Sequence, residues 1–464
     1  MEKLEALSPL DGRYRSKSLE LLPFFSDFAF FKYRVFVELE YLIYFLKFTG
    51  VSKLLAKKFT ATLRKIRNTS MADFELFKKI DTQGTKKIKA TNHDVKAIEY
   101  LIKEKLNRQK LNEIANYVHF ALTSDDVNNI AYALMLSDSL EKSIIPQVNN
   151  VHRELTKIAK KFRSSVLLAR THGQAAIPTT FGKEINVFAN RIGRKLQMLS
   201  KISLGAKING ATGTYAAHVV SFPKLNWMKF SKRFIETLNK NRKIKLKTIL
   251  VTTQIEPHDS LVEIFDCIKH INNILIGLNQ DLWSYMSHGL IEQRPIRGEI
   301  GSSTMPHKIN PIDFENSEGN LGMANALLAF LVTKLPISRL QRDLSDSTVL
   351  RNISVALGYC LVGYKSLLKG LSRISFNEQA AAQELDQHPE VLTEAIQVLL
   401  KREGVFDAYE QLKERSRGKV TRLADLHKLV EELDLDKGIK LRIKNLKPAN
   451  YIGLAGILST IRDE

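Results

Sequence analysis

The sequence predicts a mainly helical protein whose middle part is a bundle of long helices. In residues 264–282, apolar side chains recur at alternating spacings of four and three, while Asp266 and Lys269 fall off this stripe. Such a pattern is typical of an amphipathic helix that packs against other helices. Strand-like alternation of apolar and polar residues is scarce along the chain, which favours the same interpretation.

The remaining segments support this prediction in chain order. Residues 181–199 carry a second apolar stripe and predict a helix. Residues 247–256, KTILVTTQIE, are a candidate extended stretch. Residues 317–335 and 349–371 are long and apolar-striped, and each predicts a further helix of the bundle. The last hundred or so residues are more charged, and we expect a separate small helical domain from about residue 365.

Size and composition limit the class of protein. A chain of 464 residues favours two or three domains, and 44% hydrophobic residues exclude a disordered chain. No apolar run reaches the roughly 18–20 residues of a membrane helix, and the first residues lack the order of a signal peptide. Cys267 and Cys360 lie in apolar helical patterns without a CxxC spacing. We therefore expect buried thiols, no membrane association and a reducing cytoplasm.

The formal net charge of +21 raises the question of nucleic acid. The excess is spread along the chain, and its densest run, residues 240–247, is accompanied by no motif of a nucleic-acid-binding domain. We do not expect nucleic acid to be the main partner. A positive field that attracts a small polyanionic substrate is the milder interpretation.

Polar clusters occur where the helical pattern breaks, and each has a structural alternative. Arg13 with Tyr14 suits a phosphate or carboxylate, but also an ordinary turn. Thr91 can cap a helix that begins at Asn92, so that Asn92, His93 and Asp94 crowd an anion-favouring first turn. Thr123 and Ser124 precede acidic residues, which fits either a helix cap or ligand binding. His172 lies in a polar loop, as a structural residue or as an acid.

The segment EIGSSTMPHKINPIDFENSEGN, residues 299–320, contains the fifth cluster. Gly298 and Gly301 could hinge a loop that carries Ser302 and Ser303. Lys308 and Asn310 follow as partners for an anion and an amide, and Arg342, Ser347, Thr348 and Arg351 occur downstream. A flexible linker is the structural alternative, but it leaves these surrounding charges unexplained.

Several familiar catalytic motifs do not occur. The sequence has no GxSxG elbow, no HExxH or Cys/His set, no P-loop and no Rossmann glycine pattern. We therefore expect no metal and no cofactor, and catalysis by side chains alone. Proton abstraction next to a carboxylate, followed by loss of a leaving group, fits the residues present.

The run GSSTMPHKINP resembles the signature loop of the fumarase/aspartase superfamily. The segments SPLDGRY, TNHDVKAIEY, THGQAAIP, TTQIEPHD and RDLSDSTVLRN look like the adenylosuccinate lyase family, in its longer bacterial form. The resemblance extends from about residue 8 to residue 453. It implies an all-α, three-domain fold with a central long-helix bundle, divided as residues 1–112, 113–364 and 365–464. It also implies a homotetramer with a twenty-helix core, in which each active site draws on three chains.

The resemblance also implies a reaction, the β-elimination of fumarate from adenylosuccinate, giving AMP, and from succinylaminoimidazole carboxamide ribotide (SAICAR), giving AICAR. Ser302 matches the general base and His172 the general acid, with Glu315 orienting the histidine. The positions that match substrate contacts are Arg13, Tyr14, Asn92, His93, Asp94, Thr123, Ser124, Gln254, Ser303, Lys308, Ile309 through its backbone, Asn310, Asn316, Arg342, Ser347, Thr348, Val349, Leu350 and Arg351.

Two alternatives remain. A sister lyase, such as fumarase or argininosuccinate lyase, would share the serine loop but would not need the DGRY and TNHDVKA clusters. A basic binding protein on an inactive lyase scaffold would be expected to lack Ser302 or His172, and both are present.

Overall fold

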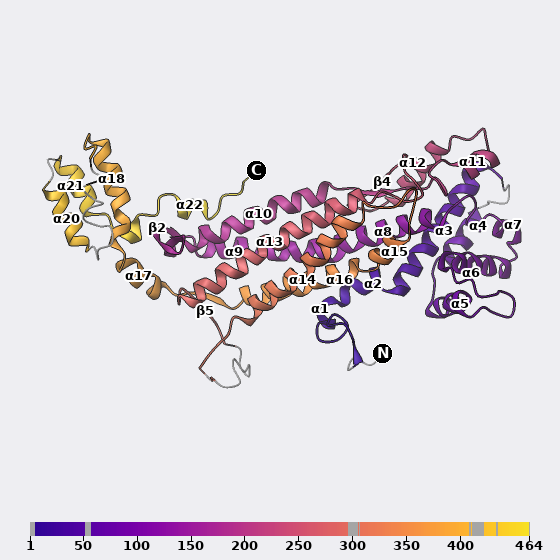
Figure 1. The fold of residues 1–464 in the computed structure, drawn as a ribbon, viewed down its shortest axis with the longest axis horizontal. Coiled ribbons are helices and arrows are strands. Elements are labelled where there is room, and N and C mark those ends of the chain that lie inside the picture. The colour runs from indigo at the N-terminus through magenta and orange to yellow at the C-terminus, as the bar shows by residue number, and fades with distance from the viewer. Residues whose placement is uncertain are drawn as a thin grey trace. The chain divides into compact units, whose positions relative to one another are not determined.

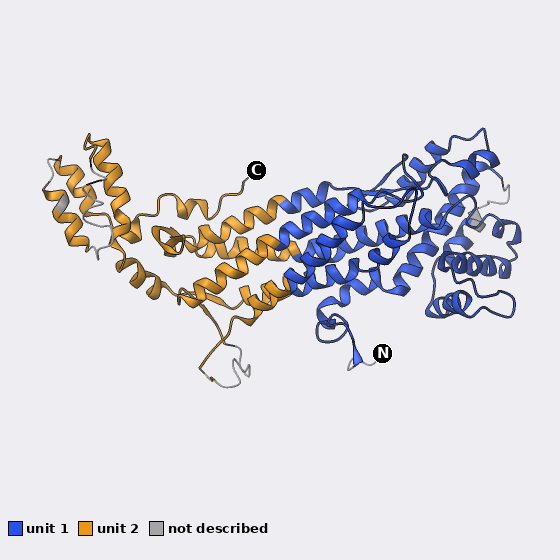
Figure 2. Ribbon diagram, viewed as in Figure 1, with its two compact units in different colours: residues 1–147, 195–272, 320–362 blue, residues 148–194, 273–319, 363–464 orange. Residues whose placement is uncertain are grey.

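The computed structural model describes residues 5–51, 57–295, 305, 307–407, 410, 422–432 and 435–463. The chain divides into two compact units, and each combines segments that are distant in the sequence (Figure 2). Unit 1 comprises Met1–Gln147, Lys195–Asn272 and Asn320–Val362, and unit 2 comprises Val148–Arg194, Asn273–Gly319 and Gly363–Glu464. The predicted domain division after residues 112 and 364 stays a prediction.

Unit 1 is built mainly from helices (Figure 1). Its elements are α1 (Arg15–Ser18), η2 (Leu19–Leu21), α2 (Leu22–Phe25), α3 (Asp27–Thr49), α4 (Lys57–Ile66), α5 (Met71–Thr82), α6 (Asp94–Arg108), α7 (Asn112–Ala115), α8 (Ser124–Ser139), the π-helical turn η3 (Leu140–Ile144), β3 (Leu204–Ala206), α11 (Ala216–Ser221), α12 (Trp227–Leu238), β4 (Leu246–Thr248) and α15 (Ser345–Leu350). Ser26 caps α3 by accepting a hydrogen bond from the Ala29 amide, and Gly50 ends that helix in the left-handed conformation.

Long helices contribute residues to both units, and they confirm the predicted helical segments. These helices are α9 (Ile145–Lys161), α10 (Phe181–Lys201), α13 (Asp259–Ser287), α14 (Ile312–Lys334) and α16 (Ile353–Leu371). The predicted stripe of α13, from Ile264 to Leu282, is buried. The prediction over 349–371 was wrong at its start, because residues 349–350 belong to α15 and a turn separates them from α16.

Short strands pair two by two. The antiparallel hairpin of β1 (Val166–Thr171) and β2 (Gln174–Thr180) was not predicted, because its residues lack a clear alternation. Strands β3 and β4 pair in parallel, and β5 (Ile291–Gln293) pairs antiparallel with β6 (Ile374–Phe376). The extended prediction over 247–256 was largely wrong, since β4 covers only its first two residues.

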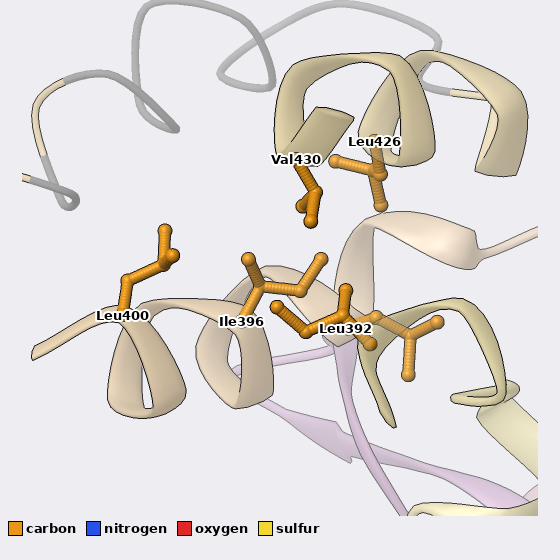
Figure 3. Packing of buried hydrophobic residues seen from close by; sticks show 6 residues of the cluster. Leu392, Ile396, Leu400, Leu426 and Val430 are labelled. Carbon is orange, nitrogen blue, oxygen red and sulfur yellow. The ribbon is translucent and has the colours of Figure 1, made fainter. Parts of the chain in front are cut away.

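Unit 2 continues through the C-terminal part of the chain. Its other elements are α17 (Glu378–Asp386), η4 (Pro389–Leu392), α18 (Thr393–Arg402), α20 (Leu423–Glu431), α21 (Lys437–Lys444), η5 (Pro448–Asn450) and α22 (Ala455–Leu458). Figure 3 shows Leu392, Ile396 and Leu400 packed with Leu426 and Val430, so η4, α18 and α20 share an apolar core. The described residues after 365 are mainly helical, with strand β6 among them, and a separate domain from about residue 365 stays a prediction.

Two further expectations concern the interior and the membrane. The thiols of Cys267 and Cys360 are buried, which confirms the prediction of buried thiols. Within the described ranges, none of the helices combines the length and the apolar composition needed to cross a bilayer.

Candidate active site

Unit 1 contains a polar cavity of about 620 Å³, here called the unit-1 cavity. It lies among α3, α5, α15, the start of α6 and the first half of α8. Its lining residues are Phe30, Arg34, Asp81, Thr82, Asn92, His93, Asp94, Ser124, Asp125, Asn128, Tyr132, Arg342, Leu344, Ser347, Thr348, Leu350 and Arg351. Guanidinium groups, carboxylates, hydroxyls and two aromatic rings therefore surround one space.

Arg34 anchors one wall of the unit-1 cavity. Its side chain is 5% exposed, and its Nη2 lies 2.8 Å from Asp94 Oδ2. Its Nε donates to Asn128 Oδ1 at 2.9 Å, and its guanidinium lies 3.6 Å from the centre of the Phe30 ring. Burial alone would raise the pKa of Asp94, but the charge and hydrogen bonding of Arg34 outweigh it and the pKa is lowered. The wall therefore holds a charged pair.

His93 connects the starts of two helices. Its Nδ1 accepts a hydrogen bond from the Lys96 amide, so His93 is the N-cap of α6, and its Nε2 lies 3.3 Å from Ser124 Oγ at the start of α8. The predicted cap at Thr91 was wrong. Asn92 has a positive φ of 46°, which is not helical, so α6 begins only at Asp94. The Thr91 hydroxyl donates to Asp81 Oδ1.

The start of α8 carries two buried carboxylates. The Thr123 amide donates to Asp126 Oδ2 at 2.9 Å, which fits the predicted cap chemistry. Asp126 Oδ1 lies 3.0 Å from Lys207 Nζ, and neither side chain is exposed. Asp125 lines the cavity, and its Oδ2 has no hydrogen-bond partner among the described residues. Burial raises the pKa of Asp125 to about 6, although Lys207, His258 and Arg342 oppose this shift.

Arg342 joins the segment before α15 to a distant loop. Its Nη1 donates to Gln254 Oε1 at 3.1 Å, and its Nη2 donates to Ser347 Oγ at 3.4 Å. Lys207 Nζ also donates to the Gln254 carbonyl, at 2.6 Å. Gln254 is therefore held beside the cavity without being one of its lining residues.

His258 is buried near these residues and does not line the unit-1 cavity. Its Nδ1 lies 3.5 Å from Glu256 Oε2 and its Nε2 lies 3.7 Å from Asp346 Oδ2, with all three side chains buried. Burial alone would lower the pKa of His258, but the neighbouring carboxylates raise it to about 9. The imidazole of His258 is therefore charged at neutral pH and lies between Glu256 and Asp346. Asp346 belongs to α15 and directly precedes Ser347, which lines the unit-1 cavity.

The structure brings a large share of the predicted residues together in unit 1. The predicted residues that line the cavity are Asn92, His93, Asp94, Ser124, Arg342, Ser347, Thr348, Leu350 and Arg351. Thr123, Gln254 and Val349 are adjacent in sequence or bonded to lining residues. Arg13 and Tyr14 lie at the turn before α1 and line no described cavity.

Sequence reasoning missed Arg34, Asp125 and Tyr132. Arg34 is buried on α3, as Phe31 and Val35 are. A cation within this apolar stripe was the sequence feature that could have indicated a site residue. Asp125 and Tyr132 offered no comparable sign, because an acidic residue in a first turn and a tyrosine in an apolar helix are ordinary features.

Unit 2 contains a second cavity, of about 520 Å³, here called the unit-2 cavity. Its lining residues are Trp283, Met286, Ser287, Ile291, Glu292, Gln293, His307, Lys308, Ile309, Asn310, Pro311 and Glu315. Glu315, in the first turn of α14, accepts a hydrogen bond from Trp283 Nε1 at 3.2 Å. The predicted residues Lys308, Ile309, Asn310 and Glu315 therefore gather at one site.

The predicted proton-transfer residues lie elsewhere or outside the description. His172 is exposed at the turn between β1 and β2, with a φ of 53°, and lines neither cavity. Ser302 and Ser303 fall outside the described residues. Asn316 accepts a hydrogen bond from Ser366 Oγ at 2.8 Å.

The unit-1 cavity is suited to an anionic ligand that also carries a flat ring. Arg342 and Arg351 add planar donors to an already paired Arg34, and such forks match phosphate and carboxylate groups. Phe30 and Tyr132, whose ring centres are 4.6 Å apart, add a small apolar surface, since both residues are mostly buried and the Arg34 guanidinium lies over Phe30. The unit-2 cavity offers a lysine and an asparagine to a carboxylate.

Comparisons with known proteins give the class first. A family profile described as lyase matches residues 13–325, and one described as the C-terminal part of adenylosuccinate lyase matches residues 338–452. The fold resembles a fumarate lyase from Mesorhizobium sp. BNC1, with a TM-score of 0.72, 16% identity and coverage of 95% and 96% of the two chains. It also resembles a 3-carboxy-cis,cis-muconate lactonizing enzyme from Pseudomonas putida, with a TM-score of 0.69, 22% identity and coverage of 95% and 94%. The chain is a lyase with the helical fold of the fumarase/aspartase superfamily, which confirms the predicted all-α class.

Sequence relatives give the family. The chain is 44% identical to adenylosuccinate lyase of Buchnera aphidicola subsp. Schizaphis graminum, over 100% of this chain and 99% of that protein. It is 44% identical to adenylosuccinate lyase of Haemophilus influenzae, and 42% identical to that of Escherichia coli K12, in each case over 98% of both chains. The chain belongs to the adenylosuccinate lyase family, as the sequence motifs indicated.

Proposed function

We propose that this protein cleaves adenylosuccinate to AMP and fumarate, and SAICAR to AICAR and fumarate, in purine nucleotide biosynthesis. The observation that carries the proposal is the identity of 44% to an adenylosuccinate lyase over the full length of the chain. The arginines and aromatic rings of the unit-1 cavity support it, because both substrates combine anionic groups with a flat heterocycle.

The proposed chemistry needs one base and one acid. The proton on the carbon next to a succinyl carboxylate is weakly acidic, and Ser302 is proposed to remove it. The carbon–nitrogen bond then breaks, its electron pair leaves with the nitrogen, and His172 is proposed to protonate that nitrogen. Because a serine hydroxyl is a weak base, Ser302 requires activation by nearby positive charge or hydrogen-bond donors.

Anion binding in this proposal is divided among the clusters. Lys308, the Ile309 backbone and Asn310 hold the succinyl carboxylates, where charge develops during the reaction. Arg13 and Tyr14 are proposed to meet the phosphate, and the unit-1 cavity to take the remainder of the nucleotide. Glu315 is proposed to orient His172 once the complete site assembles.

We further propose that the site is completed by association into a homotetramer, with three chains contributing to each site. Large apolar side chains on the long helices are exposed in the single chain, and such surfaces commonly mark interfaces. The exposed residues in question are Val187 and Met198 of α10, Trp283 of α13, and Met323 and Phe330 of α14. A cytoplasmic location, expected because the sequence offers no disulfide framework, is part of the same proposal.

The deciding experiment incubates the purified protein with adenylosuccinate, follows the ultraviolet spectrum and separates the products by chromatography. AMP and fumarate in equal amounts, without added metal or cofactor, would support the proposal. A folded tetramer that forms no products would contradict it, and the same assay with argininosuccinate, or with fumarate as substrate for hydration, would then test the sister lyases.

A further inference from the structure

Unit 2 contains a third polar cavity that the proposed reaction does not use. It has a volume of about 400 Å³ and is here called the C-terminal cavity. Its lining residues are His152, Thr156, Lys160, Arg163, Asn186, Ala189, Asn190, Ser459, Thr460 and Arg462. They come from α9, from Arg163 just after that helix, from α10, and from residues 459–462, which follow α22. No carboxylate is among these lining residues.

One face of α9 supplies the first group of polar side chains. His152, Thr156 and Lys160 are spaced four residues apart, and Arg163 follows three residues later. Residues at these spacings lie above one another on a helix. The helix therefore presents an imidazole, a hydroxyl and an ammonium group to the cavity in a row, with the Arg163 guanidinium just beyond its end.

The backbone beneath Arg163 is held closely against α10. A Cβ atom at Gly182 would lie 2.8 Å from the Arg163 Cα atom, so only glycine permits this approach. The Gly182 amide also donates to the Phe162 carbonyl at 3.0 Å. The side of the cavity that carries Arg163 is therefore a fixed part of unit 2.

The C-terminal segment forms the opposite wall, and two asparagines of α10 hold it. The Asn186 side chain donates to the Leu458 and Ile461 carbonyls at 2.7 and 2.8 Å. The Asn190 side chain donates to the Ile461 carbonyl at 3.1 Å and accepts from the Asp463 amide at 2.8 Å. Since residues 461 and 463 are both bonded, the backbone of Arg462 between them is well positioned.

An ion pair reinforces this attachment and engages the carboxylate of Asp463. Asp463 Oδ2 lies 2.6 Å from Arg194 Nη1. Its negative charge is therefore matched by a cation outside the cavity lining, and Arg462 is left facing the positive groups of α9.

The positive charges around the cavity are not compensated within the described part of the chain. Lys160, Arg163 and Arg462 have no ion pair with any described carboxylate. Burial lowers the pKa of His152, and the charge of Arg462 lowers it further. This second effect agrees with the placement of Arg462 and His152 in the lining of the same cavity.

We propose that the C-terminal cavity binds a small multivalent anion that carries phosphate or several carboxylate groups. Planar guanidinium groups and a lysine are the donors that such anions prefer. The cavity lining contains no phenylalanine, tyrosine or tryptophan on which a nucleobase could stack, which favours a compact anion over a nucleotide. This inference goes beyond the proposed reaction and does not depend on it.

The test is isothermal titration of the full-length protein with two probes, inorganic pyrophosphate and citrate, in separate experiments. We expect one site per chain for at least one probe, and the preferred probe identifies the phosphate or the carboxylate class. The double variant Lys160→Gln/Arg163→Gln and the single variant Arg462→Gln should each weaken binding by about tenfold or more, because each removes a charge-assisted hydrogen bond.

Lys157→Gln is the matched control. It removes one positive charge, as Arg462→Gln does, from the helix that carries Lys160, but Lys157 does not line the cavity and pairs with Glu154. It should bind the probe as the wild type does. Circular dichroism and lyase activity of each variant verify folding. Absence of binding of both probes to the wild type would overturn the proposal, as would equal weakening by Lys157→Gln or unchanged binding in the folded double variant.

Discussion

Arg34 and Asp94 form an ion pair in the wall of the unit-1 cavity, with 2.8 Å between Nη2 and Oδ2. Arg34 is buried on α3, whereas Asp94 is part of the first turn of α6. The pair therefore ties the first turn of one helix to the middle of another, and it orients Asn128 through the second bond of the guanidinium.

The first prediction concerns this pair. Arg34→Met should leave Asp94 without its buried partner and lower the free energy of unfolding by about 1–3 kcal/mol. It should also raise KM, because the cavity wall loses its anchor. Urea unfolding at fixed protein concentration and steady-state kinetics provide the measurements. Arg108→Met, which breaks an exposed pair with Glu104, should change either quantity little. Equal effects of the two substitutions would refute the prediction.

The second prediction concerns Asp125. Its pKa is raised by burial to about 6, so ionisation above that pH destabilises the folded state. Asp125→Asn, which imitates the protonated acid, should therefore stabilise the protein at pH 7, by no more than about 3 kcal/mol. The gain should shrink as pH falls through 6 and vanish near pH 4. Melting temperatures between pH 4 and 8 test this, and a pH-independent difference would argue against it.

The third prediction concerns His258, whose pKa of about 9 lies above that of an unfolded histidine. Its charged form stabilises the fold below about pH 6.5, and this contribution is lost as pH rises through 9. His258→Gln should thus lower the melting temperature most at pH 6 and progressively less toward pH 10. His288→Gln, an exposed position, is the control. A deficit that stays constant with pH would show that charge is not involved.

The fourth prediction tests the proposed base. Ser302→Ala should reduce kcat by about 10²–10⁴-fold while substrate binding is largely retained, because proton abstraction fails and the binding groups remain. Single-turnover kinetics and equilibrium binding of adenylosuccinate separate the two effects. Ser200→Ala, at the exposed end of α10, should leave kcat unchanged. Near-normal turnover of Ser302→Ala would remove serine 302 from this role.

The fifth prediction tests the proposed acid. His172→Ala should also lower kcat by about 10²–10⁴-fold, since the departing nitrogen would leave without a proton. A substrate with a better leaving group should regain part of that loss. The measurement is the ratio of kcat with the better leaving group to kcat with adenylosuccinate, compared between His172→Ala and His288→Ala. A ratio equal to that of the control would assign His172 a different role.

Much of the fold and part of the site could be predicted from the sequence. The stripe of α13 predicted a helix because a repeat of alternating fours and threes matches one helical face. The segments of the unit-1 cavity, from Asn92 to Arg351, could be chosen by their resemblance to family motifs. The hairpin that carries His172 could not be predicted, because strand pairing depends on a partner and not on local alternation alone.

The start of α6 shows the same limit at a single residue. Thr91 and His93 are both able to cap a helix, and the sequence favoured the threonine. The backbone of Asn92, at a φ of 46°, decided for His93, and this conformation depends on hydrogen bonds from Thr91 and Asn92 to α5.

The helical class, the family and the residues of the polar clusters follow from the amino-acid sequence, because periodicity and motifs are local properties. The pairing of Arg34 with Asp94, the burial of Asp125 and the position of Arg462 opposite α9 follow from the fold. Burial and charge pairing depend on distances between residues far apart in the chain, which no local pattern contains. An aspartate carboxyl therefore has a lowered pKa beside a guanidinium, as at Asp94, and a raised pKa where burial prevails, as at Asp125.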